Sequence, residues 1–272
     1  MKENFRFPQG CKLEQQNNRL YLPKIGWIRY RNSRDVVGEI KNVTVSRKCG
    51  KWYISVQTEF EQKTPQPKGG EIGIDMGIVR FATLSSGEYF EPINAFKNLK
   101  GKLAKLQRRL KNKVKFSQNW QKLKAKIAKL HHKIAHCRKD FLHQTSSKIS
   151  KNHAVVYVED LQVSNMSKSA RGTAEAHGKN VKQKSGLNRS ILDQSWFEFR
   201  RQLAYKLAWN GGHLIAVPPQ NTSRICPCCG YTAKENRQTQ ADFECVECGY
   251  TENADAVGAI NILRRGQEIL AA

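Results

Sequence analysis

The stretch EIGIDMGIVRF, residues 71–81, places one carboxylate, Asp75, in a run of residues that otherwise favours the interior of a β-sheet. Two further strand-like pieces follow it, VRFATLSSG and EYFEPI, with Gly77 and Ser85-Ser86-Gly87 as turns. This pattern predicts a meander of three strands. Taken alone, Asp75 could be a turn residue before Gly77, so its role depends on what the rest of the chain brings near it.

A strongly basic segment follows the meander. From residue 97 to about 150, apolar residues recur at three- and four-residue spacing on both sides of the polar KNKVKFSQN, which predicts two helices in a hairpin. Residues 97–151 contain 18 Lys and Arg and a single acid, Asp140. A solvated helix face is the ordinary explanation of a charge run, but such faces normally mix signs. We therefore expect contacts to nucleic-acid phosphates from Lys102, Lys105, Arg108, Arg109, Lys122, Lys126, Lys129 and Lys133.

The whole chain shares this positive charge. Its 272 residues include 47 Lys and Arg against 23 Asp and Glu, which gives a formal net charge of +24 and a pI of about 9.9. Such a field recruits polyanions, and nucleic acid is the expected partner. No run approaches the ~18 apolar residues of a membrane span, and the N-terminus lacks the apolar core of a signal peptide. We expect a cytoplasmic protein of a prokaryote, without a membrane partner, that joins the nucleoid when it binds DNA.

The flanking segments differ in character from the basic helices. Residues 1 to about 65 contain short alternating runs, which predict antiparallel strands of a small sheet or partial barrel, and the Pro/Gly-rich residues 61–70 form a linker. The run HAVVYVEDL, residues 153–161, predicts a buried strand that emerges at Glu159. Residues 164–190 have almost no large apolar residue and no period, so they are expected to form a mobile basic loop.

Regular structure is expected again toward the C-terminus. Helical spacing begins at Ile191, and Gly211-Gly212 ends it. The run HLIAVPP predicts another strand, and the last helix is expected to begin near Asn253. The order of elements is then a strand meander, a long helical excursion, a strand, a helix, a strand and a final helix.

The cysteines give the most specific local signal. CPCCG and CVECG each contain the unit C-x-x-C-G, with fifteen residues between Cys229 and Cys245. Four thiolates at this spacing can surround one tetrahedral zinc ion, each pair on a tight turn whose glycine lets backbone N–H groups approach sulfur. The predicted ligands are Cys226, Cys229, Cys245 and Cys248; Cys228 is excluded because it does not reproduce the spacing with a trailing glycine. A four-cysteine site has no open position, so the zinc is expected to be structural.

The other cysteines, Cys11, Cys49 and Cys137, have no partner at metal-binding spacing and are expected to be ordinary small apolar residues.

Three acids lie in or at the ends of predicted strands and helices that are far apart in the sequence. Asp75 lies in the first strand of the meander, Glu159 at the end of the later strand, and Asp255 at the opening of the last helix. Each has an ordinary explanation alone: a turn residue, a solvated strand end and a helix-start residue favoured by the dipole. The order of elements, however, is that of an RNase H-like α/β domain, in which these positions converge. Three neighbouring carboxylates repel unless a divalent cation neutralises them, which predicts a Mg²⁺ or Mn²⁺ site able to hydrolyse phosphodiesters.

The motifs GIDMG, VYVEDL, NTSRICPCCG, FECVECGY and NADAVGAINI, in this order and spacing, resemble the C-terminal half of the TnpB (OrfB) family of insertion elements, from about Gly70 to Leu263. That family is known as transposases or transposase accessory proteins and is related to the effectors of type V CRISPR systems. The resemblance implies a guide RNA, cleavage of DNA that pairs with the guide, and Asp75, Glu159 and Asp255 as catalytic acids. It implies a RuvC-like nuclease domain over 70–223 and 250–272, with the helical hairpin at 97–150 and a zinc ribbon at 224–249.

Residues 1–65 resemble only the last strands of the family's N-terminal β-barrel, which grips the guide duplex, so we expect a shortened chain. Three functions stay open: a metal-dependent, RNA-guided DNA endonuclease, a non-cleaving DNA- or RNA-binding protein from a decayed element, and a DDE-type transposase that joins strands. The placement of the acids, with the glutamate on the fourth strand, fits the RuvC arrangement better than the DDE type. The histidines near the motifs are expected to have no special role; they are His153, His177 and His213.

Overall fold

The structure is a computed structural model that describes residues 4–271. Contacts divide the chain into two compact units, Met1–Lys63 with Lys115–Lys129, and Thr64–Val114 with Leu130–Ala272. Among residues 4–271, no helix is both long enough and apolar enough to cross a membrane.

The larger unit is built on a five-stranded sheet with the order β11-β10-β7-β8-β9. Strand β10 runs parallel to both β7 and β11, whereas β8 and β9 continue from β7 as an antiparallel meander. The meander that the sequence predicts is therefore confirmed. The strands are β7 (Glu71–Asp75), β8 (Ala82–Leu84), β9 (Tyr89–Phe90), β10 (Val155–Glu159) and β11 (His213–Val217).

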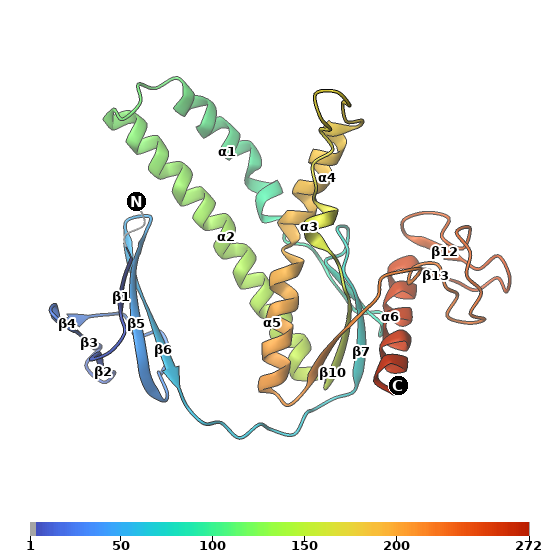
Figure 1. The fold of residues 1–272 in the computed structure, drawn as a ribbon, viewed down its shortest axis with the longest axis horizontal. Helices are drawn as coiled ribbons and strands as arrows, with labels where there is room; N and C mark the ends of the chain where they lie inside the picture. The colour runs from blue at the N-terminus through green and yellow to red at the C-terminus, as the bar shows by residue number, and fades with distance from the viewer. Residues whose placement is uncertain (1–3, 272) are drawn as a thin grey trace. The chain divides into compact units, whose positions relative to one another are not determined.

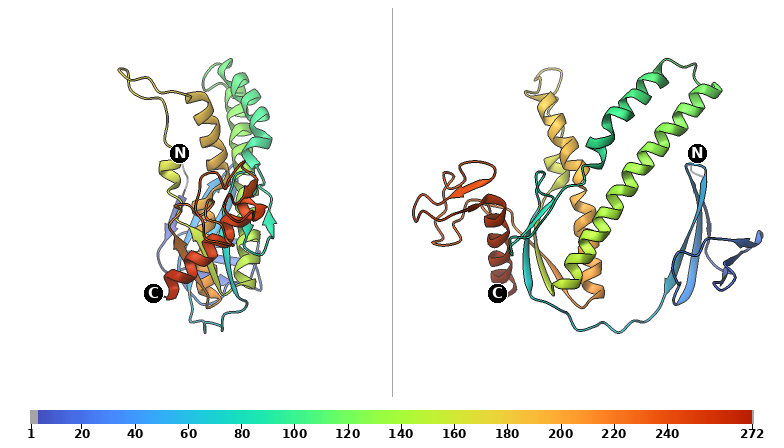
Figure 2. Two further views of the ribbon diagram at one scale, coloured as in Figure 1. Left: turned by 90° about the vertical axis from the view of Figure 1, so that its right-hand side faces the viewer. Right: turned by 180° about the vertical axis from the view of Figure 1, so that it is seen from behind.

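Helices cover both faces of this sheet (Figure 1). Helix α6 (Ala254–Ala271) packs on one face through Ile262, which lies in one cluster with Tyr157 and Val217. The opposite face meets α5 (Trp196–Trp209) and the C-terminal part of α2, and the right-hand view of Figure 2 shows the same layering from behind. Alternate residues of β7 and β10 point to the two faces, so each strand is buried on both sides.

The basic segment forms the two helices that the sequence predicts, α1 (Ala95–Lys111) and α2 (Gln118–Asn152). Asp193 anchors the start of α1, because its carboxylate accepts hydrogen bonds from the backbone N–H groups of Phe96 and Lys97 at 3.0–3.1 Å. Arg138 of α2 pairs with the same carboxylate at 2.6 Å. A negative charge at a helix N-terminus is stabilising, and here it also compensates a buried acid. The apolar stripes are confirmed by the burial of Leu103, Leu123, Leu130 and Ile134.

The prediction of a loop over residues 164–190 is wrong at both of its ends. Helix α3 (Val163–Met166) occupies its start, and α4 (Val181–Gln194) begins ten residues before the predicted helix start. Side chains of α4 hold the preceding segment: Lys184 Nζ donates to the Met166 carbonyl at 2.7 Å, and Asn188 Nδ2 donates to the Ser167 carbonyl at 2.8 Å. These tertiary contacts stabilise a helix whose polar sequence shows no apolar period.

The smaller unit contains two three-stranded antiparallel sheets, with the orders β1-β5-β6 and β2-β3-β4. They enclose a small core of Leu20, Leu22 and Val43. Cys49 is a free, half-buried cysteine in the turn between β5 and β6, with φ 51°. The strands are β1 (Asn4–Phe7), β2 (Lys12–Glu14), β3 (Arg19–Leu22), β4 (Gly26–Arg29), β5 (Glu39–Lys48) and β6 (Lys51–Glu59).

The segment between β11 and α6 forms a small module with one hairpin, β12 (Asp242–Glu244) and β13 (Thr251–Asn253). Asn236, which is fully buried, holds this module together: Nδ2 donates to the carbonyls of Arg224 and Tyr231, and Oδ1 accepts from the Val246 N–H. Helix α6 fixes the entrance to the module, since Asn261 Nδ2 donates to the carbonyls of Thr222 and Ile225, both at 2.7 Å.

Candidate active site and cysteine cluster

Two of the three predicted acids lie at the same edge of the sheet. Asp75 is the last residue of β7, and Glu159 is the last residue of β10. The two strands are parallel, and Ile74 pairs with Val158, so the two acids follow adjacent positions in neighbouring strands. Asp255 lies in the first turn of α6, which packs on β7. The topology thus brings all three acids to one region of the larger unit.

The pKa of Asp75 shows how closely these charges interact. Burial is the largest cause of its rise from an ordinary value of 3.8 to about 8, and the negative charges of Glu159 and Asp255 contribute to the same rise. The positive charge of Arg237 and the Met76 backbone N–H act in the opposite direction. A carboxylate that is both desolvated and surrounded by like charges has a high electrostatic cost, which a bound cation would offset.

Helix α6 approaches Asp75 through a glycine. A Cβ atom at Gly258 would lie 3.1 Å from Asp75 Oδ2, which is closer than a comfortable contact. The absence of a side chain at this position lets the helix backbone pass beside the carboxylate. Asp255, which lies one turn earlier on the same helix, is thereby kept near β7.

Glu159 is held by a hydrogen bond that the sequence does not reveal. Its side chain is 9% exposed, and Thr222 Oγ1 donates to Glu159 Oε1 at 2.5 Å. Burial raises the pKa of Glu159, whereas the Thr222 hydrogen bond and the charges of Arg265 and Arg237 lower it. Thr222 therefore fixes the orientation of this carboxylate and favours its ionised form.

Arg237 is a second functional candidate that sequence reasoning missed. It belongs to the cysteine-containing module, and its guanidinium lies 3.9 Å from Asp255 Oδ1. Its charge also acts on Asp75 and Glu159. Arg237 lies eighteen positions before Asp255, and no local pattern marks it, so only the folded module shows that it faces the acids.

The three carboxylates are neighbours, but they do not meet at one point. Within residues 4–271, the four cysteines are the one group of three or more His, Cys, Asp or Glu side chains whose ligand atoms all lie within 4.8 Å of one another. At least one pair of the carboxylates is farther apart than that. Carboxylate oxygens are nevertheless the ligand type that Mg²⁺ and Mn²⁺ prefer, so the donor chemistry of the site fits such an ion.

The cysteine cluster, by contrast, has a closed geometry. Cys226 Sγ lies 3.6 Å from Cys248 Sγ, and Cys229 Sγ lies 3.6 Å from Cys245 Sγ. Tetrahedral zinc with Zn–S bonds of about 2.3 Å sets neighbouring sulfurs about 3.8 Å apart, so the four thiols fit this ion. Cys228 is exposed and lies outside the group.

The two halves of the cluster have the same backbone turn. Gly230 N–H donates to the Cys226 carbonyl and Gly249 N–H donates to the Cys245 carbonyl, both at 2.9 Å. Both glycines have positive φ, 77° and 69°, which side-chain-bearing residues rarely adopt. This repeated turn is the structural counterpart of the doubled C-x-x-C-G motif.

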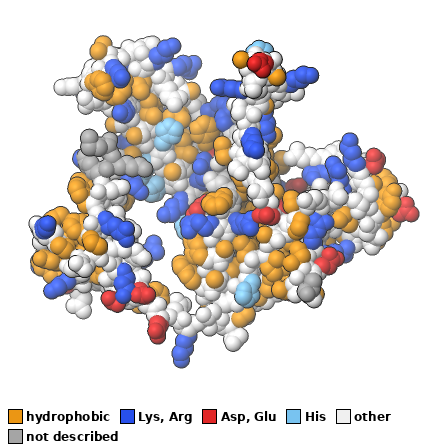
Figure 3. All heavy atoms as spheres, viewed as in Figure 1, with side chains coloured by type: hydrophobic (Ala, Val, Ile, Leu, Met, Phe, Trp, Pro, Cys, Tyr) orange, Lys and Arg blue, Asp and Glu red, His pale blue; other side chains and the backbone are white. Residues whose placement is uncertain are grey.

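The eight basic residues predicted to contact phosphates are all exposed on α1 and α2. On the face that Figure 3 shows, Lys and Arg side chains are widespread, with few acidic side chains between them. The three histidines near the motifs, His153, His177 and His213, take no part in the cysteine cluster.

Two parts of the chain match described sequence families. Residues 53–170 match the family described as "Probable transposase", and residues 196–262 match "Cas12f1-like, TNB domain". Among solved structures, the fold is similar to the cryo-EM structure of the Cas12f1-sgRNA-target DNA complex, with a TM-score of 0.56 and 19% identity. That similarity covers 82% of this chain and 45% of the other, and shows a shared α/β fold.

Curated relatives share more sequence. Over 231 residues the chain is 33% identical to a "Putative RNA-guided DNA endonuclease" of Streptomyces pristinaespiralis, covering 84% of this chain and 53% of that protein. Over 268 residues it is 60% identical to "Putative RNA-guided DNA endonuclease InsQ" of Escherichia coli (strain K12), covering 98% of this chain and 67% of InsQ. The chain thus spans between half and two thirds of the length of these relatives. An identity of 60% across almost the whole chain is far above what a shared fold alone requires, and the chain therefore belongs to the TnpB (OrfB) family of transposon-associated proteins.

Proposed function

We propose that the protein is a divalent-metal-dependent, RNA-guided DNA endonuclease that hydrolyses phosphodiester bonds at the edge of the five-stranded sheet. The observation that carries this proposal is the environment of Asp75. Its pKa is raised to about 8 by burial and by the charges of Glu159 and Asp255, so three elements distant in sequence bring acids together at a cost to the fold. Groups with strongly shifted pKa values gather at functional sites.

The topology supports an RNase H-like, RuvC-like nuclease domain. Numbered in chain order, the sheet has the strand order 3-2-1-4-5, with the first strand, β7, beside the fourth, β10. The acids lie at the ends of those two adjacent strands and on the last helix. In open α/β sheets, ligands bind beyond the carboxyl ends of the strands where the strand order reverses, which is where Asp75 and Glu159 lie. By this interpretation, the module at 224–249 is a zinc ribbon and the sheets of the smaller unit are part of a barrel.

Asp75, Glu159 and Asp255 are the residues that would hold Mg²⁺ or Mn²⁺. When bound, such ions activate a water molecule and stabilise the departing 3′-oxygen of a phosphodiester. The chain's own contribution is positional. Thr222 orients Glu159, Gly258 lets α6 approach Asp75, and Arg237 supplies a positive charge on the side of the cysteine module.

The basic helices supply the nucleic-acid surface in this proposal. Their exposed lysines and arginines, 18 of them against one acid over residues 97–151, would neutralise phosphates of DNA and of a guide RNA. The relatives named above carry RNA-guided DNA cleavage in their names, which supports the same partners for this chain. The four cysteines would hold a structural zinc ion that stabilises the module carrying Arg237.

The test combines two measurements on the full chain. Sequencing of RNA that co-purifies with the protein should yield one discrete transcript from an element end, and that complex should cut paired DNA only when Mg²⁺ is present. Asp75→Asn should abolish cutting without loss of RNA, whereas Asp140→Asn, which alters an exposed acid on α2, should cut normally. Random or absent RNA, or cutting that survives Asp75→Asn, would contradict the proposal.

A further inference from the structure

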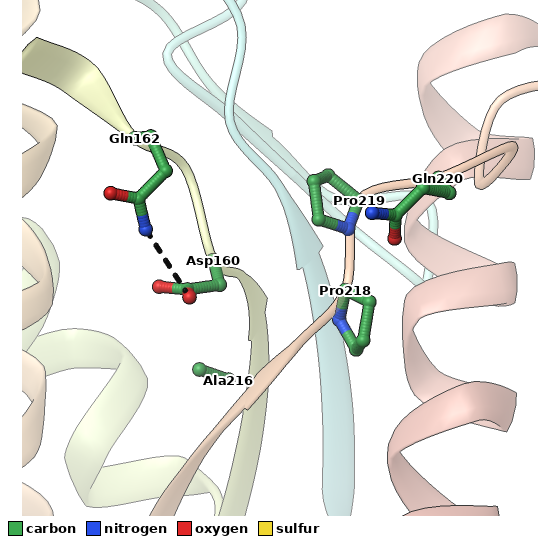
Figure 4. A pocket seen from close by; sticks show the side chains of 6 residues that line it. All are labelled: Asp160, Gln162, Ala216, Pro218, Pro219 and Gln220. Atoms are coloured by element: carbon green, nitrogen blue, oxygen red, sulfur yellow. Dashed lines mark hydrogen bonds between the residues drawn. The ribbon is translucent and has the colours of Figure 1, made fainter. Parts of the chain in front are cut away.

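A hollow of about 320 Å³ opens beyond the carboxyl ends of β10 and β11 (Figure 4). In this view the side chains of Asp160 and Gln162 extend from the β10 side, whereas Pro218, Pro219 and Gln220 border the other side. Ala216 lies on β11 at its base. None of these residues is among the proposed metal ligands.

The hollow is joined to the proposed active site by short connections. Asp160 directly follows Glu159, and its backbone N–H donates to the Val217 carbonyl at 2.8 Å. Thr222 Oγ1, which donates to Glu159, also lies 3.3 Å from the Pro219 carbonyl oxygen. One wall of the hollow and the Glu159 carboxylate therefore share a single support.

Helix α6 fixes the other wall. Arg265 donates to the carbonyl of Pro218 at 2.6 Å and to the carbonyl of Gln220 at 2.8 Å, so the loop after β11 is tied to the helix that carries Asp255. Two consecutive prolines restrict this loop further. The loop that borders the hollow is therefore anchored to the elements that carry the acids.

The chemistry of the lining suits a flat ring with a polar edge. Proline rings offer apolar surface to a ring face. The Asp160 carboxylate accepts from Arg200 and Gln162 and keeps lone pairs for a further donor. The Gln220 side-chain amide, which can donate and accept, has no hydrogen-bond partner within the described residues. Arg200 pairs with Asp160 and balances its negative charge, so the anionic backbone of a nucleic acid can lie near the hollow.

We propose that this hollow receives one unstacked nucleobase from the single strand that passes the active site, next to the phosphate to be cut. The inference rests on the proposed function and adds a base preference to it. A carboxylate accepts from the exocyclic amino group of cytosine, and thymine has no such group, so cytosine is favoured over thymine in the hollow. A base of single-stranded DNA is already unpaired, so moving it out of the stack costs less free energy than extruding a base from a duplex.

The test measures binding without cutting. Fluorescence anisotropy, with Ca²⁺ in place of Mg²⁺, should give the wild-type protein about tenfold higher affinity for oligo(dC) than for oligo(dT) of equal length, the discrimination of about one base-edge contact. Ala216→Leu should fill the hollow and bring the ratio close to one while leaving the oligo(dT) affinity unchanged. Ala208→Leu adds the same side chain on an exposed position of α5 and should keep the ratio. Asp160→Asn should also remove the preference, because an amide can donate to the thymine carbonyl.

The controls separate this inference from the proposed function. Asp75→Asn should keep the binding ratio while losing cleavage, so a failed nuclease and a failed base site give different results. Parallel titrations with oligo(rC), oligo(rU) and free CMP identify the source of the base. A preference that appears with RNA alone would overturn the assignment to the DNA strand, whereas competition by a high concentration of free CMP is expected, because the hollow recognises the cytosine ring. An unchanged ratio in Ala216→Leu would overturn the site itself.

Discussion

The four cysteines and the three carboxylates are both candidate metal sites, but they are built in opposite ways. The cysteines lie between residues 226 and 248, and two copies of one turn bring their sulfur atoms within 4.8 Å of one another. The carboxylates come from two strands and a helix between residues 75 and 255, and they do not meet so closely. A local turn can preform a closed site, whereas only the complete sheet can assemble the open one.

The electrostatics follow the same division. The cysteine cluster offers four thiols, which would fill a tetrahedral coordination shell, so a bound ion would stabilise the module and take no part in chemistry. The carboxylate site gathers like charges around a partly desolvated Asp75, which reduces the stability of the protein in the absence of a cation. Natural proteins accept such a cost mainly where function needs it.

Removal of one carboxylate should affect the two candidate metal sites very differently. Glu159→Gln keeps the shape of the side chain and removes its charge, so we expect DNA cleavage to fall by about 1,000-fold or more. Zinc content, measured by atomic emission, should stay at the wild-type value because the cysteines are supported separately. Glu88→Gln, which alters an exposed acid paired with Lys148, is the matched control and should cut normally. Loss of zinc from Glu159→Gln would show that the two sites are not independent.

Removal of one thiolate tests whether the cysteine module supports the carboxylate site. Cys245→Ser should lose the bound zinc and expose residues 224–249 to proteolysis, whereas Cys228→Ser should retain both zinc and protection. Because Arg237 reaches Asp255 from this module, we also expect cleavage to fall by roughly 10–100-fold, the range typical of lost support around a metal site. Full cleavage by a zinc-free variant would contradict the proposed contribution of the module.

Removal of the Thr222 hydroxyl should lower the cleavage rate less than removal of a carboxylate. Thr222→Val removes the hydroxyl that donates to Glu159 but keeps the size of the side chain, and we expect cleavage to slow by about tenfold. Thr222→Ser retains the hydroxyl and should restore most of the rate. A Mg²⁺ titration tests whether Thr222 positions Glu159 for the metal. If it does, Thr222→Val should need a higher Mg²⁺ concentration for half-maximal cleavage while its fold is preserved. Equal rates in Val and Ser variants would leave Thr222 without a role in catalysis.

The cysteine site is local and the carboxylate site is assembled from distant elements, and this difference decided how much of each could be predicted from the sequence. The clustering of the four cysteines follows from spacing alone, because a C-x-x-C-G turn is a local structure that Gly230 and Gly249 specify. The acids could be placed at the ends of elements, because strand and helix patterns are strong near Asp75, Glu159 and Asp255. Their convergence required the order of elements and a family resemblance in addition.

Residues that act across long sequence separations escaped prediction. Thr222 is 63 residues from Glu159, and Arg237 acts from a different module, so no periodic pattern identifies either of them. Residues 181–190 of helix α4 were missed for the same reason, since the stability of this helix comes from contacts such as Lys184 with the Met166 carbonyl and Asp193 with the start of α1. Local sequence specifies elements, and these contacts specify which weak elements form.

The smallest expected effect concerns stability. Without added Mg²⁺, Asp75 has a pKa of about 8 in the folded protein against 3.8 ordinarily, so between about pH 4 and pH 8 the folded protein retains a proton that the unfolded chain has released. Stability must then fall as the pH rises through this range, and it levels off above pH 8. Asp75→Asn removes the titrating group, so its Tm should exceed that of the wild type by on the order of 5 °C at pH 8 and by little near pH 4.

Thermal unfolding at several pH values, with zinc retained, measures this difference. Added Mg²⁺ should raise the wild-type Tm at pH 8 and leave Asp75→Asn nearly unchanged, because the cation offsets the same repulsion that the amide removes. Asp140→Asn should follow the wild type at every pH, since that acid is exposed on α2. If the wild type and Asp75→Asn kept a constant Tm difference from pH 4 to pH 8, the acid at the end of β7 would carry no excess charge repulsion, and the contrast between an open carboxylate site and a closed cysteine site would lose its electrostatic basis.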